Sequence, residues 1–351
     1  MNIKRIIRTI CFLLILCLVF VGLNDVLAMN PVINAAGIKR INSLYAQPKD
    51  SLDVLLFGAS GVYRAWNSMQ AWEELGITSY AWCTGSQSVA STRYLIEDTL
   101  KHQTPKVILI DYRMFRKEPE EITSGAIRRV SDLMPFSRTR IDAINAMLDA
   151  APAVETQFNR WEYYISFMQY HSRWEDGLIP SDFTEKLDPL HGTPISQLSF
   201  NISPQAPASS PTEEIEPIDE IYQDVLSDLC EYVLQLDIPV LFTMMPYNPP
   251  LKERKQLNWV ESVLDFYGLP YMNMNDPEYF DAYGLDFSED FYDKGHVNLK
   301  GMQKVTARFG AYLKDAYGLA DHRGDAYYAH WDEALPVYHK RLDRYEWKKK
   351  S

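Results

Sequence analysis

The sequence predicts an α/β domain built on a parallel sheet with helices on both faces. Short apolar runs such as residues 51–57 and 105–110 lack the alternation of a half-exposed strand. Segments with apolar residues at helical spacing separate these runs. The chain has 351 residues, of which 46% are hydrophobic and 23% are charged, so it can bury a large core and is neither disordered nor fibrous.

The expected elements alternate along the chain. The strand candidates are residues 51–57, 77–82, 105–110, 239–244 and 271–274. The expected helices are a segment through Met69, Trp72 and Leu75, and residues 89–100, 218–236, 251–267 and 298–317.

Three segments lie outside this alternation: an insertion, a linker before the domain and an extension after it. Residues 118–237 contain helical segments at 127–148 and 161–171 and a loop at 201–217 with four prolines, which we interpret as a helical insertion or lid. The α/β domain is therefore expected to cover residues 52–320. Residues 30–51 are expected to form a linker, and residues 321–351 a C-terminal extension, most simply a solvated surface helix with a frayed end.

Residues 1–29 have the pattern of an export element. Three basic residues among the first eight precede an apolar run at 10–23, and Val26-Leu27-Ala28 suits a signal peptidase. The 14-residue run spans about 21 Å, less than the roughly 30 Å hydrocarbon core, which favours a cleaved signal peptide. Counted to Met29 it becomes a marginal membrane span, so an uncleaved anchor stays open. In both cases the positive-inside rule places the rest of the chain outside the cytoplasm.

The composition argues against several classes of partner. There are 35 basic and 47 acidic residues, a net charge of −12, so we expect no nucleic-acid partner. Only Cys83 and Cys230 lie outside the apolar N-terminal segment, which is too few for a disulfide framework or zinc cluster. Among the remaining histidines only His322 and His330 are closely spaced, with no cysteine nearby, so we expect no metal and no other cofactor.

The first motif that carries chemistry is Phe57-Gly58-Ala59-Ser60-Gly61, at the end of the first expected strand. Open parallel sheets bind ligands at the carboxyl ends of their strands, where a serine can act as nucleophile. Glycine permits a sharp turn, and the N–H groups that open the next helix can receive an oxyanion. An ordinary turn with a helix cap is the more common origin of such a motif alone. Because Val62 replaces the last glycine, it is not the α/β-hydrolase elbow.

The second motif lies in residues 290–298, where Asp293 and His296 are three residues apart. In a tight turn the Asp293 carboxylate can accept the Nδ1 proton of His296, which leaves Nε2 to deprotonate a serine. A turn followed by a helix cap at Asn298 explains the segment when it is considered alone. That interpretation is less satisfactory when Ser60 is considered as well, because both segments occupy loops at the same expected edge of the sheet.

Together, these residues resemble the SGNH (GDSL-like) hydrolase superfamily over about residues 52–317. Gly58-Ala59-Ser60 and Asp293-Lys-Gly-His296 match the two ends of the family pattern. The resemblance implies a flavodoxin-like three-layer α/β/α sandwich. It also implies Ser60 as nucleophile, His296 as base and Asp293 as the residue that orients the base.

The middle of the family pattern is matched less well. The oxyanion glycine after the second strand corresponds to Gly85, or to Cys83 after a two-residue shift, and either would donate its backbone N–H. The third block, Gly-x-Asn-Asp, is replaced by Asp111-Tyr112-Arg113-Met114, so the asparagine donor is missing. Arg113 can supply N–H groups instead, or pair with Asp111 or other acids. A poorer oxyanion hole would favour acyl transfer to a bound acceptor over hydrolysis.

The export element and the aromatic C-terminal extension resemble, in architecture, membrane-anchored SGNH-like proteins of bacterial cell surfaces. These include relatives of the D-alanyl transfer protein and of alginate-type O-acetylation proteins. The resemblance implies an extracytoplasmic serine enzyme that transfers an acyl group to a cell-surface glycan or removes it, beside a membrane-bound O-acyltransferase. A noncatalytic module that binds a glycan or supports such an acyltransferase is the alternative.

Overall fold

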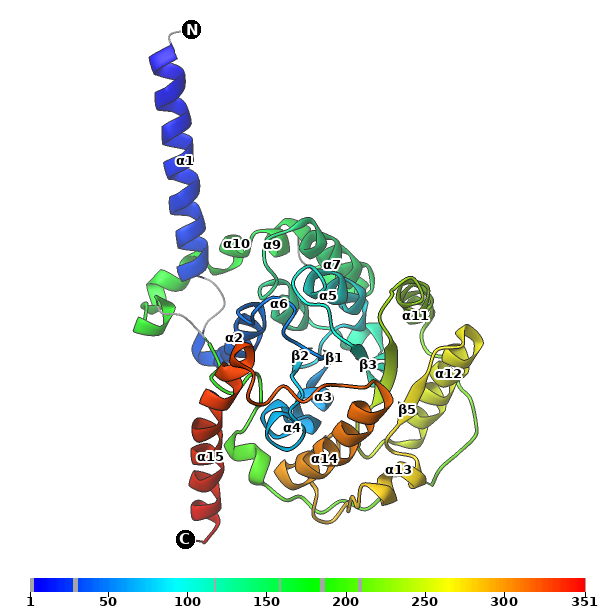
Figure 1. The fold of residues 1–351 in the computed structure, drawn as a ribbon. Helices are drawn as coiled ribbons and strands as arrows, with labels where there is room; N and C mark the ends of the chain where they lie inside the picture. Colours follow the sequence, from blue (N-terminus) through cyan, green and yellow to red (C-terminus); the bar gives the residue numbers. More distant parts are fainter. Residues whose placement is uncertain are drawn as a thin grey trace.

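The computed structural model describes residues 3–27, 31–116, 118–157, 159–183, 187–207 and 210–350. At its centre is a five-stranded parallel sheet in the order β2-β1-β3-β4-β5, which is the flavodoxin-like doubly wound order (Figure 1). The predicted three-layer α/β/α sandwich is confirmed. The strands are β1 (Val54–Gly58), β2 (Ser79–Cys83), β3 (Val107–Asp111), β4 (Val240–Met244) and β5 (Tyr271–Asn273).

The sheet is buried on both faces, which explains why its strands read as continuous apolar runs. Leu55 and Phe57 of β1 belong to one hydrophobic cluster, whereas Val54 and Leu56 belong to the other. The first cluster is covered by α2 (Pro31–Tyr45), α5 (Thr92–Thr99), α11 (Glu220–Val233) and α12 (Leu251–Tyr267). The second is covered by α3 (Ser60–Ala65), α13 (Pro277–Ala282) and α14 (Leu299–Ala316), and α4 (Ser68–Leu75) contributes to both.

The helical insertion thickens one of these layers. It lies between β3 and β4, and its helices are α6 (Ser124–Ser131), α7 (Arg138–Asp149), α8 (Pro152–Glu155), α9 (Arg160–Tyr164) and α10 (Ser166–Tyr170). Ile127 and Ile144 are fully buried in the same cluster as Leu55 and Phe57, and α7 packs against α5. The insertion therefore shares the core of the domain.

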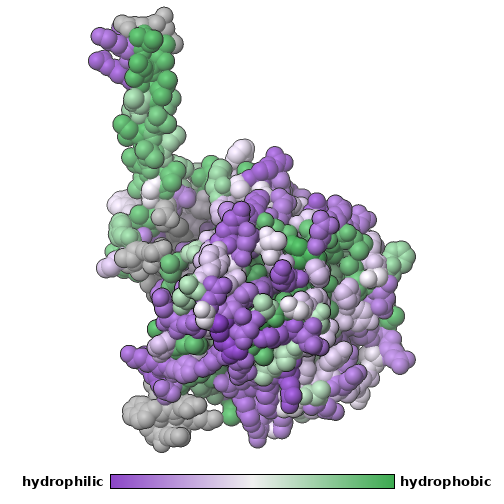
Figure 2. All heavy atoms as spheres, viewed as in Figure 1, coloured by the Kyte–Doolittle hydropathy of each residue, from purple (hydrophilic) through white to green (hydrophobic). Residues whose placement is uncertain are grey.

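The N-terminal helix α1 (Ile3–Val26) projects from the body as a column of hydrophobic residues (Figures 1 and 2). Ile3–Asn24 is long and apolar enough to cross a membrane, and none of its most apolar window is buried. These 22 residues span about 33 Å, more than the apolar run alone suggested. The length and composition fit a membrane anchor and a signal sequence alike. The end of α1 contacts the insertion, because Asn24 Oδ1 accepts the backbone N–H of Phe167 at 2.9 Å.

The linker expected at residues 30–51 is wrong over most of its length. Residues 31–45 form α2, and its side chains Ile38, Ile41 and Leu44 are buried beside β2. These three residues recur about one helical turn apart, which is the pattern of a helix that packs on a core.

The C-terminal extension is more than a solvated helix. α15 (Ala329–Lys350) packs against α4, and its side chains Trp331 and Tyr338 are 0% and 2% exposed. The Trp331 ring stacks on His191 with 3.9 Å between centroids, and Tyr338 Oη accepts a hydrogen bond from Asn67 Nδ2. Trp331, Ala334 and Tyr338 share one helix face, and burial of this face in the main core corrects the sequence-based expectation.

Candidate active site

Ser60 is the first residue of α3, directly beyond the carboxyl end of β1. Ala59 occupies the N-cap position, and no side chain caps this helix. The Ser60 hydroxyl instead lies 2.8 Å from His296 Nε2. The interpretation of the motif as an ordinary turn with a helix cap therefore holds for the turn, but no side chain provides the cap.

Gly58 is required because another strand approaches it closely. A Cβ atom at this position would lie 2.5 Å from Val62 Cγ2 and 2.7 Å from Asp111 Cβ. Both atoms are buried and fixed close to their backbones. The glycine therefore lets β1 turn into α3 beside the end of β3.

Gly58→Ala is accordingly expected to destabilise the fold by about 1–3 kcal/mol, because the added methyl group overpacks this junction. Gly125→Ala is the matched control, since the nearest heavy atom to its added Cβ is 3.6 Å away in a helix. Urea unfolding of both variants measures the effect. Equal unfolding midpoints for Gly58→Ala, Gly125→Ala and the parent chain would contradict this explanation.

His296 and Asp293 face each other across a short antiparallel hairpin. The hairpin consists of β6 (Phe291–Asp293) and β7 (His296–Val297), in which these two residues are paired. His296 Nδ1 lies 2.9 Å from Asp293 Oδ1, and the same oxygen accepts the backbone N–H of Gly295 at 2.7 Å. Asn298 then caps α14 by accepting the N–H of Gly301. The turn-and-cap interpretation of this segment is correct as local structure, and the same turn also positions the Asp–His pair.

The surroundings of His296 favour its neutral form. Burial is the largest cause that lowers the pKa of His296 below its ordinary value; Asp293 opposes this effect, and Arg113 and Arg64 reinforce it. The Tyr292 ring stacks on the imidazole with 5.3 Å between centroids. A neutral imidazole whose Nδ1 proton is held by a carboxylate presents Nε2 as a base toward Ser60.

The Ser60–His296 pair opens into a cavity of about 300 Å³. Arg113 lines it and is 6% exposed. The guanidinium donates to the carbonyl of Gly295 at 2.7 Å and lies 3.8 Å from the centroid of the Tyr247 ring. Arg113 therefore reaches the Ser60 cavity from the turn that follows β3. Arg113 also lies close to Gly61, since a Cβ atom there would be 2.8 Å from Arg113 Nη1 and the guanidinium would have to shift.

Asp111 also lines this cavity, at the end of β3. Its Oδ1 accepts the backbone N–H of Arg113 at 3.1 Å. Burial raises the pKa of Asp111 to about 6, while the charge and N–H of Arg113 act in the opposite direction. The buried carboxylate thus ties the end of β3 to Arg113.

Two of the expected oxyanion residues are not in the Ser60 cavity. Cys83 is the buried last residue of β2, and its thiol Sγ contacts the carbonyl of Leu56. Gly85 lines a neighbouring cavity, where its carbonyl accepts a hydrogen bond from Arg129 Nε. Among the described residues, the loop after β2 contributes Ser86 and Gln87 to the Ser60 cavity instead.

Gln87 is the functional candidate that the sequence analysis missed. Its side chain is 1% exposed, and its Oε1 accepts the backbone N–H of Thr84 at 2.9 Å. Its Nε2 has no hydrogen-bond partner within the part of the chain that the structure describes. Ser86 precedes it with a positive φ of 56°, which turns the loop sharply. The sequence could have indicated this residue, because a glutamine with a side-chain N–H donor stands two residues after the expected oxyanion glycine, Gly85.

The proline-rich loop, expected as a possible lid, contacts β6 and the segment that precedes it. Ser203 donates its backbone N–H to Phe291 O, and Gln205 donates to Phe287 O, both at 2.8 Å. None of the described residues of this loop lines the Ser60 cavity. Glu121, from the start of the insertion, does line it.

Comparison of the chain with protein-family models, with curated proteins and with solved structures found no match. Assignment of a function therefore depends on the residues and the geometry of this site.

Proposed function

We propose that this protein is an SGNH-type serine enzyme that acts on acyl esters, with Ser60 as nucleophile, His296 as base and Asp293 as the residue that orients it. The observation that carries the proposal is the continuous contact from Asp293 through His296 to the Ser60 hydroxyl, with 2.9 Å and 2.8 Å separations. The position of Ser60 at the switch point between β1 and β3 supports it, because doubly wound sheets bind ligands there.

The proposed reaction has two steps. Ser60 Oγ attacks the acyl carbonyl carbon while its proton passes to His296 Nε2. The bond to the leaving alkoxide then breaks, and that oxygen takes the proton from His296. In the second step a hydroxyl group of the acceptor, or water, gives its proton to His296 and attacks the acyl–serine ester, and Ser60 Oγ leaves with that proton.

The oxyanion donors are expected to come from side chains. Gln87 Nε2 is a buried donor without a partner among the described residues, and Arg113 adds a buried positive charge to the same cavity. Donors held in a cavity can stabilise a developing oxyanion strongly, by about 3 to 4 kcal/mol for a good donor. We assign to Gln87 and Arg113 the role that the asparagine of the family pattern would have.

A transfer reaction to a surface polysaccharide is the form of this chemistry that we favour. Acylation of Ser60 by a chromogenic acetyl ester should be followed by slow release in buffer and faster release when a glycan acceptor is added, because a bound hydroxyl acts at high effective molarity. Stopped-flow measurement of the deacylation rate with and without acceptor tests this. Fast turnover that no acceptor changes would identify a simple esterase, and absence of acylation would favour the noncatalytic accessory role.

We further propose that α1 anchors the domain outside the cytoplasm, beside a membrane-bound O-acyltransferase. The basic residues Lys4, Arg5 and Arg8 precede the apolar part of the helix and would hold the N-terminus inside. Alkaline phosphatase fused after residue 351 is expected to be active, and a cytoplasmic reporter at the same position inactive. The opposite pair of results would overturn this orientation.

A further inference from the structure

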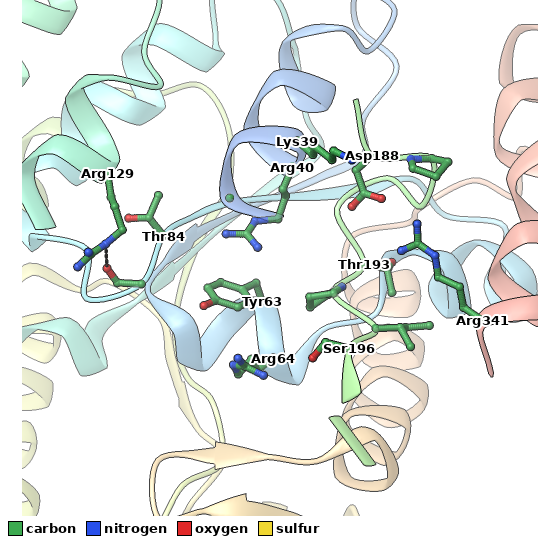
Figure 3. A pocket seen from close by; sticks show the side chains of 15 residues that line it. Lys39, Arg40, Tyr63, Arg64, Thr84, Arg129, Asp188, Thr193, Ser196 and Arg341 are labelled. Carbon is green, nitrogen blue, oxygen red and sulfur yellow. Dashed lines mark hydrogen bonds between the residues drawn. The ribbon is translucent and has the colours of Figure 1, made fainter. Parts of the chain in front are cut away.

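A second, larger cavity of about 660 Å³ adjoins the proposed active site (Figure 3). Its walls come from the loop after β2, from the segment 188–196, and from four helices that are distant in the sequence: α2, α3, α6 and α15. Each helix contributes at least one basic side chain, so we call this space the cationic cavity. The five are Lys39, Arg40, Arg64, Arg129 and Arg341, and Asp188 is the one acidic residue among the described residues that line the cavity.

Within the described part of the chain, the five basic side chains have one carboxylate among them, that of Asp188. Over the described ranges, none of the five forms an ion pair with a carboxylate within 4.0 Å. The Asp188 carboxylate accepts the backbone N–H of Leu190 at 3.0 Å. Burial raises the pKa of Asp188, and the charges of Arg341, Arg40 and Lys39 act in the opposite direction, so this carboxylate offsets part of the positive charge. The cavity keeps an excess of positive charge in a chain whose net charge is −12, and the overall charge does not require such a concentration.

Arg40 is the most informative of the five. It is 4% exposed, one of its guanidinium nitrogens donates to the carbonyl of Cys83, and its Nε has no partner among the described residues. Figure 3 shows the guanidinium groups of Arg40 and Arg64 on either side of the Tyr63 ring, with Arg40 4.1 Å from the ring centroid. A buried guanidinium with an unused N–H donor is unfavourable in free energy unless an anion accepts a hydrogen bond from it.

The two cavities share two structural elements. α3 begins with Ser60 in the active site and presents Tyr63 and Arg64 to the cationic cavity. The loop after β2 presents Gly85 to the cationic cavity, and Ser86 and Gln87 to the active site. A polymer bound in the cationic cavity therefore lies next to the nucleophile.

We propose that this cavity binds the negatively charged groups, carboxylate or phosphate, of the glycan chain that accepts the acyl group at Ser60. This inference rests on the proposed function and specifies its substrate as an anionic glycan. Tyr63 and Ser196 also line the cavity with hydroxyl groups, which suit sugar hydroxyls better than lipid acyl chains. Arg and Lys provide the charge-assisted hydrogen bonds that hold carboxylates and phosphates.

The test measures binding by the full chain in nonionic detergent, with Ser60→Ala as the background so that catalysis does not contribute. The probes are tetragalacturonic acid, a glycerol phosphate tetramer, neutral maltotetraose, and vesicles that contain an anionic lipid. We expect calorimetric binding of at least one charged oligomer, at least tenfold tighter than maltotetraose, and its loss at high salt. Which charged oligomer binds distinguishes a carboxylate from a phosphate ligand.

The variant Lys39→Glu/Arg341→Glu should weaken this binding at least tenfold, whereas Lys39→Arg/Arg341→Lys should retain it. Lys340→Glu is the matched control, because Lys340 is the exposed neighbour of Arg341 on α15 and does not line the cavity. Binding that is equal for charged and neutral oligomers, restricted to vesicles, or equally weakened by Lys340→Glu would overturn the proposal. Absence of binding while the parent chain still acylates Ser60 would refute this inference and leave the proposed function intact.

Discussion

Replacing Ser60 by alanine is expected to reduce the rate of acyl-ester cleavage by at least about 10⁴-fold, because no other hydroxyl in the cavity contacts His296 in the described structure. The stability of the fold should change little, since Ser60 Oγ provides no helix cap. The measurement is the initial rate with a chromogenic acetyl ester.

Ser86→Ala is the matched control for this experiment. Ser86 lines the same cavity and also carries a hydroxyl, but its hydroxyl makes no contact with His296 among the described interactions. It should retain most of the activity. If the two serine variants lose activity equally, the nucleophile has been assigned incorrectly.

The second large effect is expected for His296→Gln, which removes the base and should slow acylation by about 10³-fold or more. In the parent chain the rate should rise with pH and level off above the pKa of His296. Because burial lowers that pKa, the midpoint of the rise should lie below the ordinary histidine value near 6.5. The measurement is the pH dependence of single-turnover acylation.

A second Asp–His pair provides the control. His322 Nε2 lies 3.1 Å from Asp53 Oδ1, and neither residue lines the Ser60 cavity. His322→Gln is expected to leave the rate and its pH dependence unchanged. If the midpoint of the rise in rate lies well above pH 6.5 in the parent chain, a group other than His296 controls the reaction.

The sheet could be predicted because its physical signal is local. Each strand is buried on both faces and therefore forms a continuous apolar run, and α12 (Leu251–Tyr267) matches the predicted helix at both ends. α2 was missed because it directly follows the export element and its apolar pattern is short. Ile38, Ile41 and Leu44 are recognised as core residues only when β2 is seen beside them.

The contact between the three residues of the proposed triad could be predicted from the sequence, because one turn places Asp293 beside His296 and one strand end places Ser60 at the same edge of the sheet. Gln87 and the cationic cavity could not. The free Nε2 of Gln87 depends on how the loop after β2 folds back on Thr84. The five basic residues come from four helices, and only the packing of α2 and α15 on the same domain brings them together.

The central claim is that Ser60 is an activated nucleophile, and labelling with a fluorophosphonate probe tests it most directly. The full chain in detergent should be labelled on one residue, which mass spectrometry of the digested protein should identify as Ser60. Labelling should be absent in Ser60→Ala, strongly slowed in His296→Gln and unchanged in His322→Gln. A parent chain that stays unlabelled under conditions that label a known serine hydrolase, or that is labelled on another residue, would contradict the account.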